Sequence, residues 1–120
     1  MTAEEDRSEI EAAQEVRIET RAADGTAHRT IIWVVVEDGH VYVRSVNGAT
    51  ARWYREARQR PVVALHVGRR RVPFTAVPAT DAASVAACSA GLARKYRRSY
   101  SLASMLKPDI LETTLRLDPA

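Results

Sequence analysis

Apolar and polar residues alternate along several short stretches of the chain, which is the pattern of half-buried β-strands. Three such stretches come early in the sequence, at residues 16–22, 28–37 and 40–46. Asp-Gly pairs at positions 24–25 and 38–39 separate them and predict tight turns, because both residue types tolerate a positive φ. The middle stretch contains the unbroken apolar run Ile31–Val36, so we expect a central strand covered on both faces. The pattern predicts a three-stranded meander.

After Asn47 the apolar positions follow the period of a helix. Ala49, Trp53 and Ala57 recur at intervals of four residues, which places them on one helix face. The side chain of Asn47 is suited to cap the start of this helix. Pro61 predicts its end, because the residue before a proline resists the α conformation.

Two further alternating stretches follow, at residues 62–67 and 70–77. Pro73 has no N–H to donate to a neighbouring strand, so the second stretch is expected to lie at a sheet edge or to contain a bulge. A second long helix is expected to begin after Thr80 or Asp81. Its apolar stripe would consist of Val85, Cys88, Leu92 and Tyr96.

The remaining segments are shorter. Residues 8–15 predict a surface helix, residues 99–109 an irregular segment, and residues 114–117 a last short strand. Six short antiparallel strands with two inserted helices can bury their apolar faces by closing into a barrel, with the helices over its open sides.

Length and composition agree with one folded domain. The chain has 120 residues, of which 46% are hydrophobic and 28% charged, an ordinary globular composition. We therefore expect an α+β fold in one domain spanning residues 1–120. It would consist of an acidic N-terminal helix within residues 1–15 and a six-stranded antiparallel barrel, with two main helices, over residues 16–118.

The single cysteine, Cys88, excludes an intrachain disulfide. It falls on a predicted helix stripe, which favours a buried and unreactive thiol. The N-terminal residues are acidic and lack the order of a signal peptide, and no apolar run is long enough to cross a bilayer. We therefore expect a cytoplasmic protein without a membrane partner.

Charge is unevenly distributed along the chain. The net charge is +3, but residues 1–15 hold six acids and one arginine, so they carry −5 and the remainder carries +8. All basic residues except Lys95 and Lys107 are arginines, which suit bidentate binding of phosphate or carboxylate. A GC-rich genome would also favour arginine codons, and we assign it the larger share of this bias.

The most informative stretch is the end of the third predicted strand and the helix after it. Arg44 and Ser45 leave the strand, and Arg52 follows about one turn into the helix, so we expect both arginines to be exposed. The first N–H groups of a helix have no internal partners and favour an anion. The spacing suits a phosphate site, although a capped helix with solvated arginines would show the same spacing.

The same stretch carries a family resemblance. The residues Val-Tyr-Val-Arg-Ser (41–45), Gly-Ala (48–49), Arg-Trp-Tyr (52–54) and Pro-Val-Val-Ala-Leu-His-Val-Gly (61–68) are similar to motifs of the actinobacterial deazaflavin-dependent nitroreductases. These belong to the split β-barrel flavin- and deazaflavin-binding superfamily. The order of elements from about Val16 to Asp118 is similar as well.

The resemblance implies a site and an activity. It places a cofactor phosphate near Arg44, Ser45, Gly48 and Arg52, and a ring system against Thr30, Ile31 and Ile32. It implies a homodimeric oxidoreductase that uses a deazaflavin coenzyme or flavin mononucleotide (FMN) to transfer hydride to a small organic molecule. The phosphate loop of that family usually carries a lysine and often a proline. Neither occurs between Ser45 and Tyr54, so Arg52 must take the place of the lysine.

Other functions remain open at this level. A non-catalytic protein that binds a cofactor or small ligand would need the same barrel, and some split-barrel proteins bind haem or no known ligand. His28, His40 and His66 lack metal-ligand spacing, so no metal site is expected. Turn and helix-end positions account for the arginines at 69–71 and 94–98, so we do not expect nucleic-acid binding.

Overall fold

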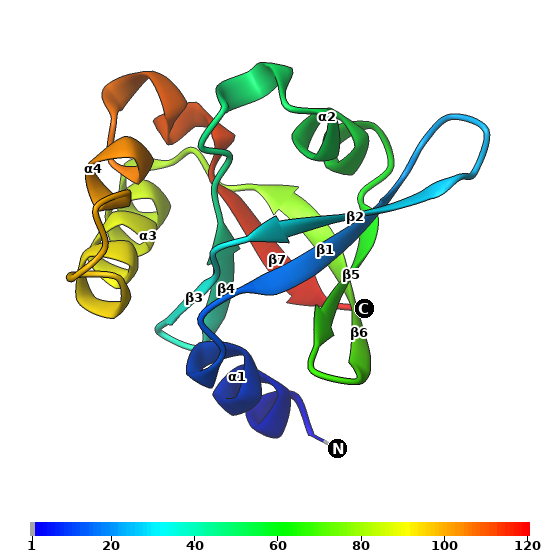
Figure 1. Ribbon diagram of the computed structural model, residues 1–120, viewed down its shortest axis with the longest axis horizontal. Coiled ribbons are helices and arrows are strands. Elements are labelled where there is room, and N and C mark those ends of the chain that lie inside the picture. The colour runs from blue at the N-terminus through cyan, green and yellow to red at the C-terminus, as the bar shows by residue number, and fades with distance from the viewer. Residues whose placement is uncertain (1) are drawn as a thin grey trace.

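The computed structural model describes residues 2–120 and shows an α+β fold (Figure 1). The strands are β1 (Val16–Arg21), β2 (Ala27–Ile32), β3 (Val35–Glu37), β4 (His40–Val43), β5 (Val62–Val67), β6 (Arg70–Pro78) and β7 (Leu115–Pro119). The helices are α1 (Ala3–Ala12), α2 (Arg52–Gln59), α3 (Ala82–Lys95) and α4 (Leu102–Met105), with 3₁₀ turns η1 (Gly48–Thr50) and η2 (Pro108–Thr113).

All seven strands form one antiparallel sheet in the order β2-β1-β5-β6-β7-β4-β3. The sheet curls into a half-barrel, and Figure 1 shows β1 and β2 crossing in front of β4 and β7. Its two edges are β2 and β3, which follow each other directly in the chain. The barrel is therefore open along one side, between strands joined only by Trp33 and Val34.

The prediction of six strands was wrong, because the apolar stretch 28–37 is two strands. The backbone between them is bonded to side chains of α3. The N–H of Val34 donates to the Tyr96 hydroxyl at 3.2 Å, and its carbonyl accepts from Lys95 Nζ at 2.8 Å. Trp33 stacks on the Tyr96 ring, with centroids 3.9 Å apart. These contacts hold the chain where it leaves one sheet edge for the other.

The predicted three-stranded meander is wrong for the same reason. β1 pairs with β2 as expected, but β2 has no ladder to β4. Instead β4 pairs with β7 and β3. The register of this second half places Leu117 opposite Val41 and Leu115 opposite Val43.

Two apolar clusters hold the fold together. The inner face of the half-barrel forms the larger one, which includes Ile18, Leu65 and Leu115 and is covered by Trp53 and Ala57 of α2. The smaller cluster lies between the outer face of β3 and β4 and the helices α3 and α4. Cys88, Leu92 and Tyr96 of the predicted α3 stripe are buried in it, and Val85 is partly buried.

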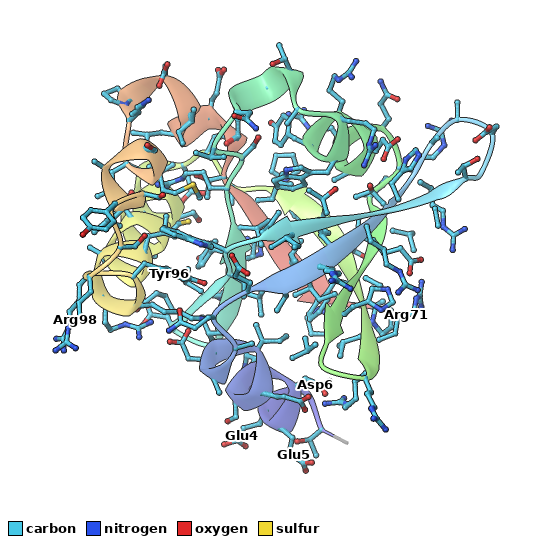
Figure 2. The ribbon with its side chains drawn as sticks, in the orientation of Figure 1. Glu4, Glu5, Asp6, Arg71, Tyr96 and Arg98 are labelled. Carbon is cyan, nitrogen blue, oxygen red and sulfur yellow. The ribbon has the colours of Figure 1, made fainter. Side chains whose placement is uncertain are left out.

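Helix boundaries follow local capping. Thr2 caps α1 by accepting from the N–H of Glu5 at 3.1 Å, so this helix begins earlier than residue 8. Glu4, Glu5 and Asp6 then lie in its first turn, where the helix dipole favours acids (Figure 2). Asp81 caps α3 as predicted, accepting from the N–H of Ser84 at 3.1 Å.

The expectation that the strand at residues 70–77 lies at a sheet edge or contains a bulge is also wrong. β6 lies between β5 and β7, and Pro73 pairs with Ala64 of β5 without a bulge. Its carbonyl accepts from the N–H of Ala120, just beyond the Phe74–Pro119 pair that ends the β7 ladder. The missing N–H therefore falls where the ladder with β7 has already ended, so no interior ladder bond is lost.

Side chains tie α1 to the barrel. Arg70, in the β5–β6 hairpin, binds Asp6 and Glu9, and Arg94 of α3 binds Glu11 at 2.8 Å and Glu37 at 2.9 Å. Within residues 2–120, no helix has the length and apolar character needed to span a bilayer.

Candidate functional site

A cavity of about 330 Å³ lies where the barrel is open, between the end of β2 and the chain that follows β4. We call it the split cavity. Its lining consists of Glu15, Thr30, Ile31, Ile32, Trp33, Arg44, Val46, Asn47, Trp53, Ser101, Ser104 and Met105. Apolar side chains and two indole rings therefore share the wall with hydroxyl, amide and guanidinium groups, a mixture typical of small-molecule and cofactor sites.

Arg44 is the most unusual member of this lining. Contrary to the prediction that it is exposed, only 2% of its surface is accessible. Its Nε donates to Thr114 Oγ1 at 2.9 Å, Nη1 donates to Ser89 Oγ and the Met105 carbonyl at 3.0 Å each, and Nη2 donates to the Val85 carbonyl at 3.2 Å. All these acceptors are neutral.

The positive charge of Arg44 is therefore not balanced by any group within residues 2–120. Among residues 2–120, no carboxylate lies within salt-bridge distance of its guanidinium group. Burial lowers the pKa of Arg44, but an arginine side chain keeps its proton at neutral pH. Four hydrogen bonds also leave one of its five N–H groups without a partner. A buried cation of this kind favours an anion in the adjoining cavity.

The turn after Arg44 is held by its own hydrogen bonds. Ser45 Oγ donates to the Gly48 carbonyl at 2.8 Å, and the Ser45 N–H donates to Thr113 Oγ1 at 3.0 Å. Gly48 has a φ of 77°, a conformation that favours glycine. Neither residue lines the split cavity, so both shape the turn that carries Val46 and Asn47 into the wall.

Arg52 lies at the rim of the cavity. It is the first residue of α2, and its side chain is about half exposed, as predicted. Its Nη2 is 3.5 Å from Thr30 Oγ1, and its Nε is 3.9 Å from Glu56 Oε1. Ala51 precedes it and provides no side-chain cap for α2. The free end of the Arg52 side chain can therefore reach an anionic group at the cavity entrance.

The structure brings four of the seven predicted site residues into one wall: Thr30, Ile31, Ile32 and Arg44. Arg52 contacts this wall through Thr30, and Ser45 and Gly48 support it from behind. Sequence reasoning missed the contribution of α4. A helix of four residues is too short to show a period, and it lies in the segment 99–109 that was expected to be irregular.

A second polar cluster lies on the outer face of the sheet, around Glu19. The carboxylate accepts from His66 Nε2 at 2.7 Å, from Arg21 at 3.0 Å, and from Arg71 at 3.0 and 3.2 Å. The hydrogen bonds from Arg71 are the largest cause that lowers the pKa of Glu19, to about 2. This acid therefore stays ionised at neutral pH, and the neighbouring Arg21 and Arg71 balance its negative charge.

The other titratable groups are held in structural roles. Glu56 of α2 accepts from Thr20 Oγ1 at 2.7 Å and lies 3.0 Å from His28 Nδ1. Cys88 is buried, and this burial raises the pKa of its thiol to about 11, in agreement with an unreactive cysteine. Among residues 2–120, no three His, Cys, Asp or Glu side chains are grouped so as to hold a metal ion.

Comparison with solved structures supports the assignment of the fold. The chain is similar to a putative pyridoxamine 5′-phosphate oxidase from Listeria innocua (TM-score 0.70, 13% identity, covering 98% of this chain and 92% of that one). It is similar to HutZ, the heme storage protein from Vibrio cholerae (TM-score 0.68, 14% identity, covering 98% of this chain and 89% of that one). It is also similar to an F420-H2 dependent reductase, FDR-A (TM-score 0.69, 16% identity, covering 88% of this chain and 94% of that one).

At these identities the similarity shows a shared split-barrel fold and nothing finer. No curated protein matches the sequence. Residues 6–117 match the family described as "Uncharacterized protein conserved in bacteria (DUF2255)". This match covers nearly the whole chain, so the protein belongs to the DUF2255 family and shares its fold with F420 reductases, a putative pyridoxamine 5′-phosphate oxidase and HutZ.

Proposed function

We propose that this protein binds a flavin- or deazaflavin-type cofactor in the split cavity and is an oxidoreductase that transfers hydride to a small organic molecule. The observation that carries the proposal is Arg44, a buried cation without a carboxylate partner among residues 2–120, in the wall of an amphipathic cavity. A cofactor with a flat ring and an anionic tail matches both properties. FMN and the deazaflavin coenzyme are the two candidates.

The residues present fit such a group. Ile31, Ile32 and Trp33 offer apolar surface for the ring, and Trp33 is held in position by its stack on Tyr96. Thr30 and Asn47 supply groups that hydrogen-bond to a polar ring edge. We assign the cofactor phosphate to Arg52 at the rim. Arg44, in the wall of the cavity, would balance part of its negative charge.

The chemistry would come from the cofactor, which supplies the hydride when bound. The protein would bind and orient the ring, keep water from it and hold the counter-charge. The described residues that line the split cavity include one acid, Glu15, and no histidine, cysteine or lysine. This scarcity of proton donors favours a second candidate, a non-catalytic protein that carries or senses the same class of ligand.

We also propose a homodimer in which the partner subunit covers the open side of the split cavity. Ile31 and Val46 both line the cavity, yet they are 55% and 48% exposed. A ring cofactor needs a drier environment than this open rim gives, and a second copy over these two residues would provide it. Light scattering of the wild type and of Ile31→Glu tests the proposal. A dimer that Ile31→Glu converts to a monomer is expected, and a monomeric wild type would contradict it.

The test of the function is a set of titrations. Purified protein is titrated with FMN, the deazaflavin coenzyme, riboflavin and hemin, followed by absorbance and fluorescence. We expect FMN or the deazaflavin coenzyme to bind more tightly than riboflavin, which lacks the phosphate. Arg52→Ala should weaken binding about tenfold, through loss of one charge-assisted contact. Arg55→Ala is the matched control, because Arg55 is exposed on the same helix and does not line the split cavity.

Turnover then separates the two candidate functions. The loaded protein is mixed with a hydride donor and a panel of small acceptors. Multiple turnovers support the oxidoreductase, and stable binding without turnover supports the carrier or sensor. If none of the four compounds binds, the cofactor assignment fails.

A further inference from the structure

A second hollow, of about 290 Å³, lies on the outer face of the sheet. We call it the outer hollow. Arg17 of β1, Arg29 of β2 and His66 of β5 line it from three adjacent strands. The ladder places Arg17 directly opposite both Ile31 and His66, and it places Arg29 opposite Glu19. These basic side chains therefore share one face of the sheet.

In the part of the chain that the structure describes, the two arginines of the outer hollow have no partner of their own. Across residues 2–120, neither guanidinium group makes a hydrogen bond or an ion pair. Both residues are exposed, so both groups are accessible to a ligand. The nearby acid Glu19 does not neutralise them, because its two oxygens are taken by Arg21, Arg71 and His66. The remaining acid at the hollow is Glu15.

His66 can add a third donor. Its Nε2 lies 2.7 Å from Glu19 Oε1, and since that carboxylate is ionised it accepts, so Nε2 carries a proton. The other ring nitrogen, Nδ1, makes no hydrogen bond within residues 2–120. The bond to Glu19 therefore fixes the imidazole and leaves Nδ1 for a ligand. The hollow thus combines two free guanidinium groups with one oriented ring.

The outer hollow adjoins the split cavity. Glu15 and Ile31 line both, so the two spaces meet across these side chains. A small molecule that contacts a cofactor ring in the split cavity across Glu15 and Ile31 would have its far end near the arginines. This adjacency connects the hollow to the substrate of the proposed reaction.

We propose that the outer hollow binds the oxyanion group of the substrate, so that the substrates are organic acids or phosphate esters. This inference rests on the proposed function for the identity of the reaction, but the hollow itself is testable without any cofactor. Paired guanidinium groups on adjacent strands suit the bidentate geometry of a carboxylate or phosphate. The single acid Glu15 would disfavour long polyanions and leave room for one compact group.

The first experiment uses the protein without cofactor. Inorganic phosphate and benzoate are titrated while amide shifts are followed by NMR. We expect saturable shifts confined to β1, β2 and β5 around residues 17, 29 and 66. The variant Arg17→Ala/Arg29→Ala should bind at least tenfold more weakly, whereas Arg55→Ala/Arg98→Ala, which removes two exposed arginines away from the hollow, should bind like the wild type. All four arginines are exposed, so both variants should keep the wild-type fold. Equal weakening in both variants, or no saturable shift, would overturn the proposal.

The second experiment separates the substrate from the cofactor. Dissociation constants of FMN and the deazaflavin coenzyme are measured for the Arg17→Ala/Arg29→Ala variant. Unchanged constants support the assignment of the hollow to the substrate, and a tenfold loss would overturn it in favour of a cofactor tail. In turnover, an acidic acceptor should lose at least tenfold in kcat/KM in this variant while its neutral amide loses nothing. Equal losses for both would also overturn the proposal. If no cofactor binds the wild type, the proposed function fails and the substrate assignment with it, whereas localised phosphate binding would show that the anion site stands.

Discussion

Glu19 and Arg44 are both almost fully buried charges, yet the protein treats them in opposite ways. Glu19, on the outer face of the sheet, is surrounded by Arg21, Arg71 and His66. Among the described residues, Arg44, beside the split cavity, donates hydrogen bonds only to neutral oxygens, which come from α3, α4 and Thr114, the residue before β7. The first charge is balanced inside the protein. The second is hydrogen-bonded but not balanced.

This difference separates structural charge from charge that is available to a ligand. A balanced pair has little to gain from a further ion, because its carboxylate and guanidinium groups already neutralise each other. An unbalanced buried cation gains electrostatic energy from any anion that reaches it, since the surrounding dielectric is low. The split cavity beside Arg44 is therefore where we expect the cofactor to bind. The following predictions test the contrast, beginning with the largest effect.

Replacement of Arg44 by alanine should have the largest effect on stability. Three acceptors in α3 and α4 and the hydroxyl of Thr114 would lose their donor, and a cavity would remain. We expect the free energy of unfolding to fall by about 3 kcal/mol, measured by urea denaturation. Arg44→Met, which keeps most of the volume without the charge, should lose less. A variant Arg44→Ala as stable as the wild type would contradict the view that Arg44 stabilises the packing of α3 and α4 through these hydrogen bonds.

Replacement of Glu19 by glutamine should cost about 2 kcal/mol, since Arg21 and Arg71 are half exposed and partly screened by water. The pKa of Glu19 is lowered from 4.5 to about 2 in the folded protein. Its contribution is therefore complete above pH 4.5 and is lost as the pH falls towards 2. Acid unfolding should show this loss in the wild type and a smaller one in Glu19→Gln. Parallel pH profiles for the two proteins would contradict the assignment.

High salt should have a smaller effect on stability than these two replacements, and it should weaken the contacts of Glu19 more than those of Arg44. Raising sodium chloride to about 1 M shortens the screening length to about 3 Å. We expect the coupling between Glu19 and Arg71, measured by a double-mutant cycle, to fall by less than about 1 kcal/mol. The cost of Arg44→Ala should not fall, because its hydrogen bonds to neutral groups are buried, and any chloride in the cavity would add to the stability that Arg44 provides. A salt dependence of equal size at both sites would erase the contrast.

Arg52→Ala should have the smallest effect on stability, within about 0.5 kcal/mol, because its side chain is half exposed and its contacts are long. The same change should weaken cofactor binding about tenfold, as proposed above. Thermal unfolding with and without FMN measures both effects in one series. A large loss of stability without cofactor would show that Arg52, like Arg44, is structural.

The sequence predicted most elements because their periods are local. β1, β5, β6 and α3 agree with alternation or with an apolar stripe read from neighbouring residues. The break in the apolar run Ile31–Val36 was not predictable in this way. It depends on Lys95 and Tyr96, which bind the backbone of Val34 from about sixty positions away.

The candidate site was predictable only in part, for the same reason. Arg44 was recognised from its place after a strand, but its burial depends on acceptors at positions 85, 89, 105 and 114. No local pattern brings these positions together. The expectation that Arg44 is exposed is therefore wrong, whereas the same expectation for Arg52 is confirmed.

The two-residue connection between β2 and β3 also limits what the protein can accommodate. Ile32 and Val35 end the two free sheet edges, and three peptide steps allow their Cα atoms to separate by no more than about 11 Å. At this end of the two strands, the width of the opening thus has an upper limit fixed by chain length, whatever the side chains around it. A relative with extra residues at this point would open wider here and admit a thicker or branched molecule.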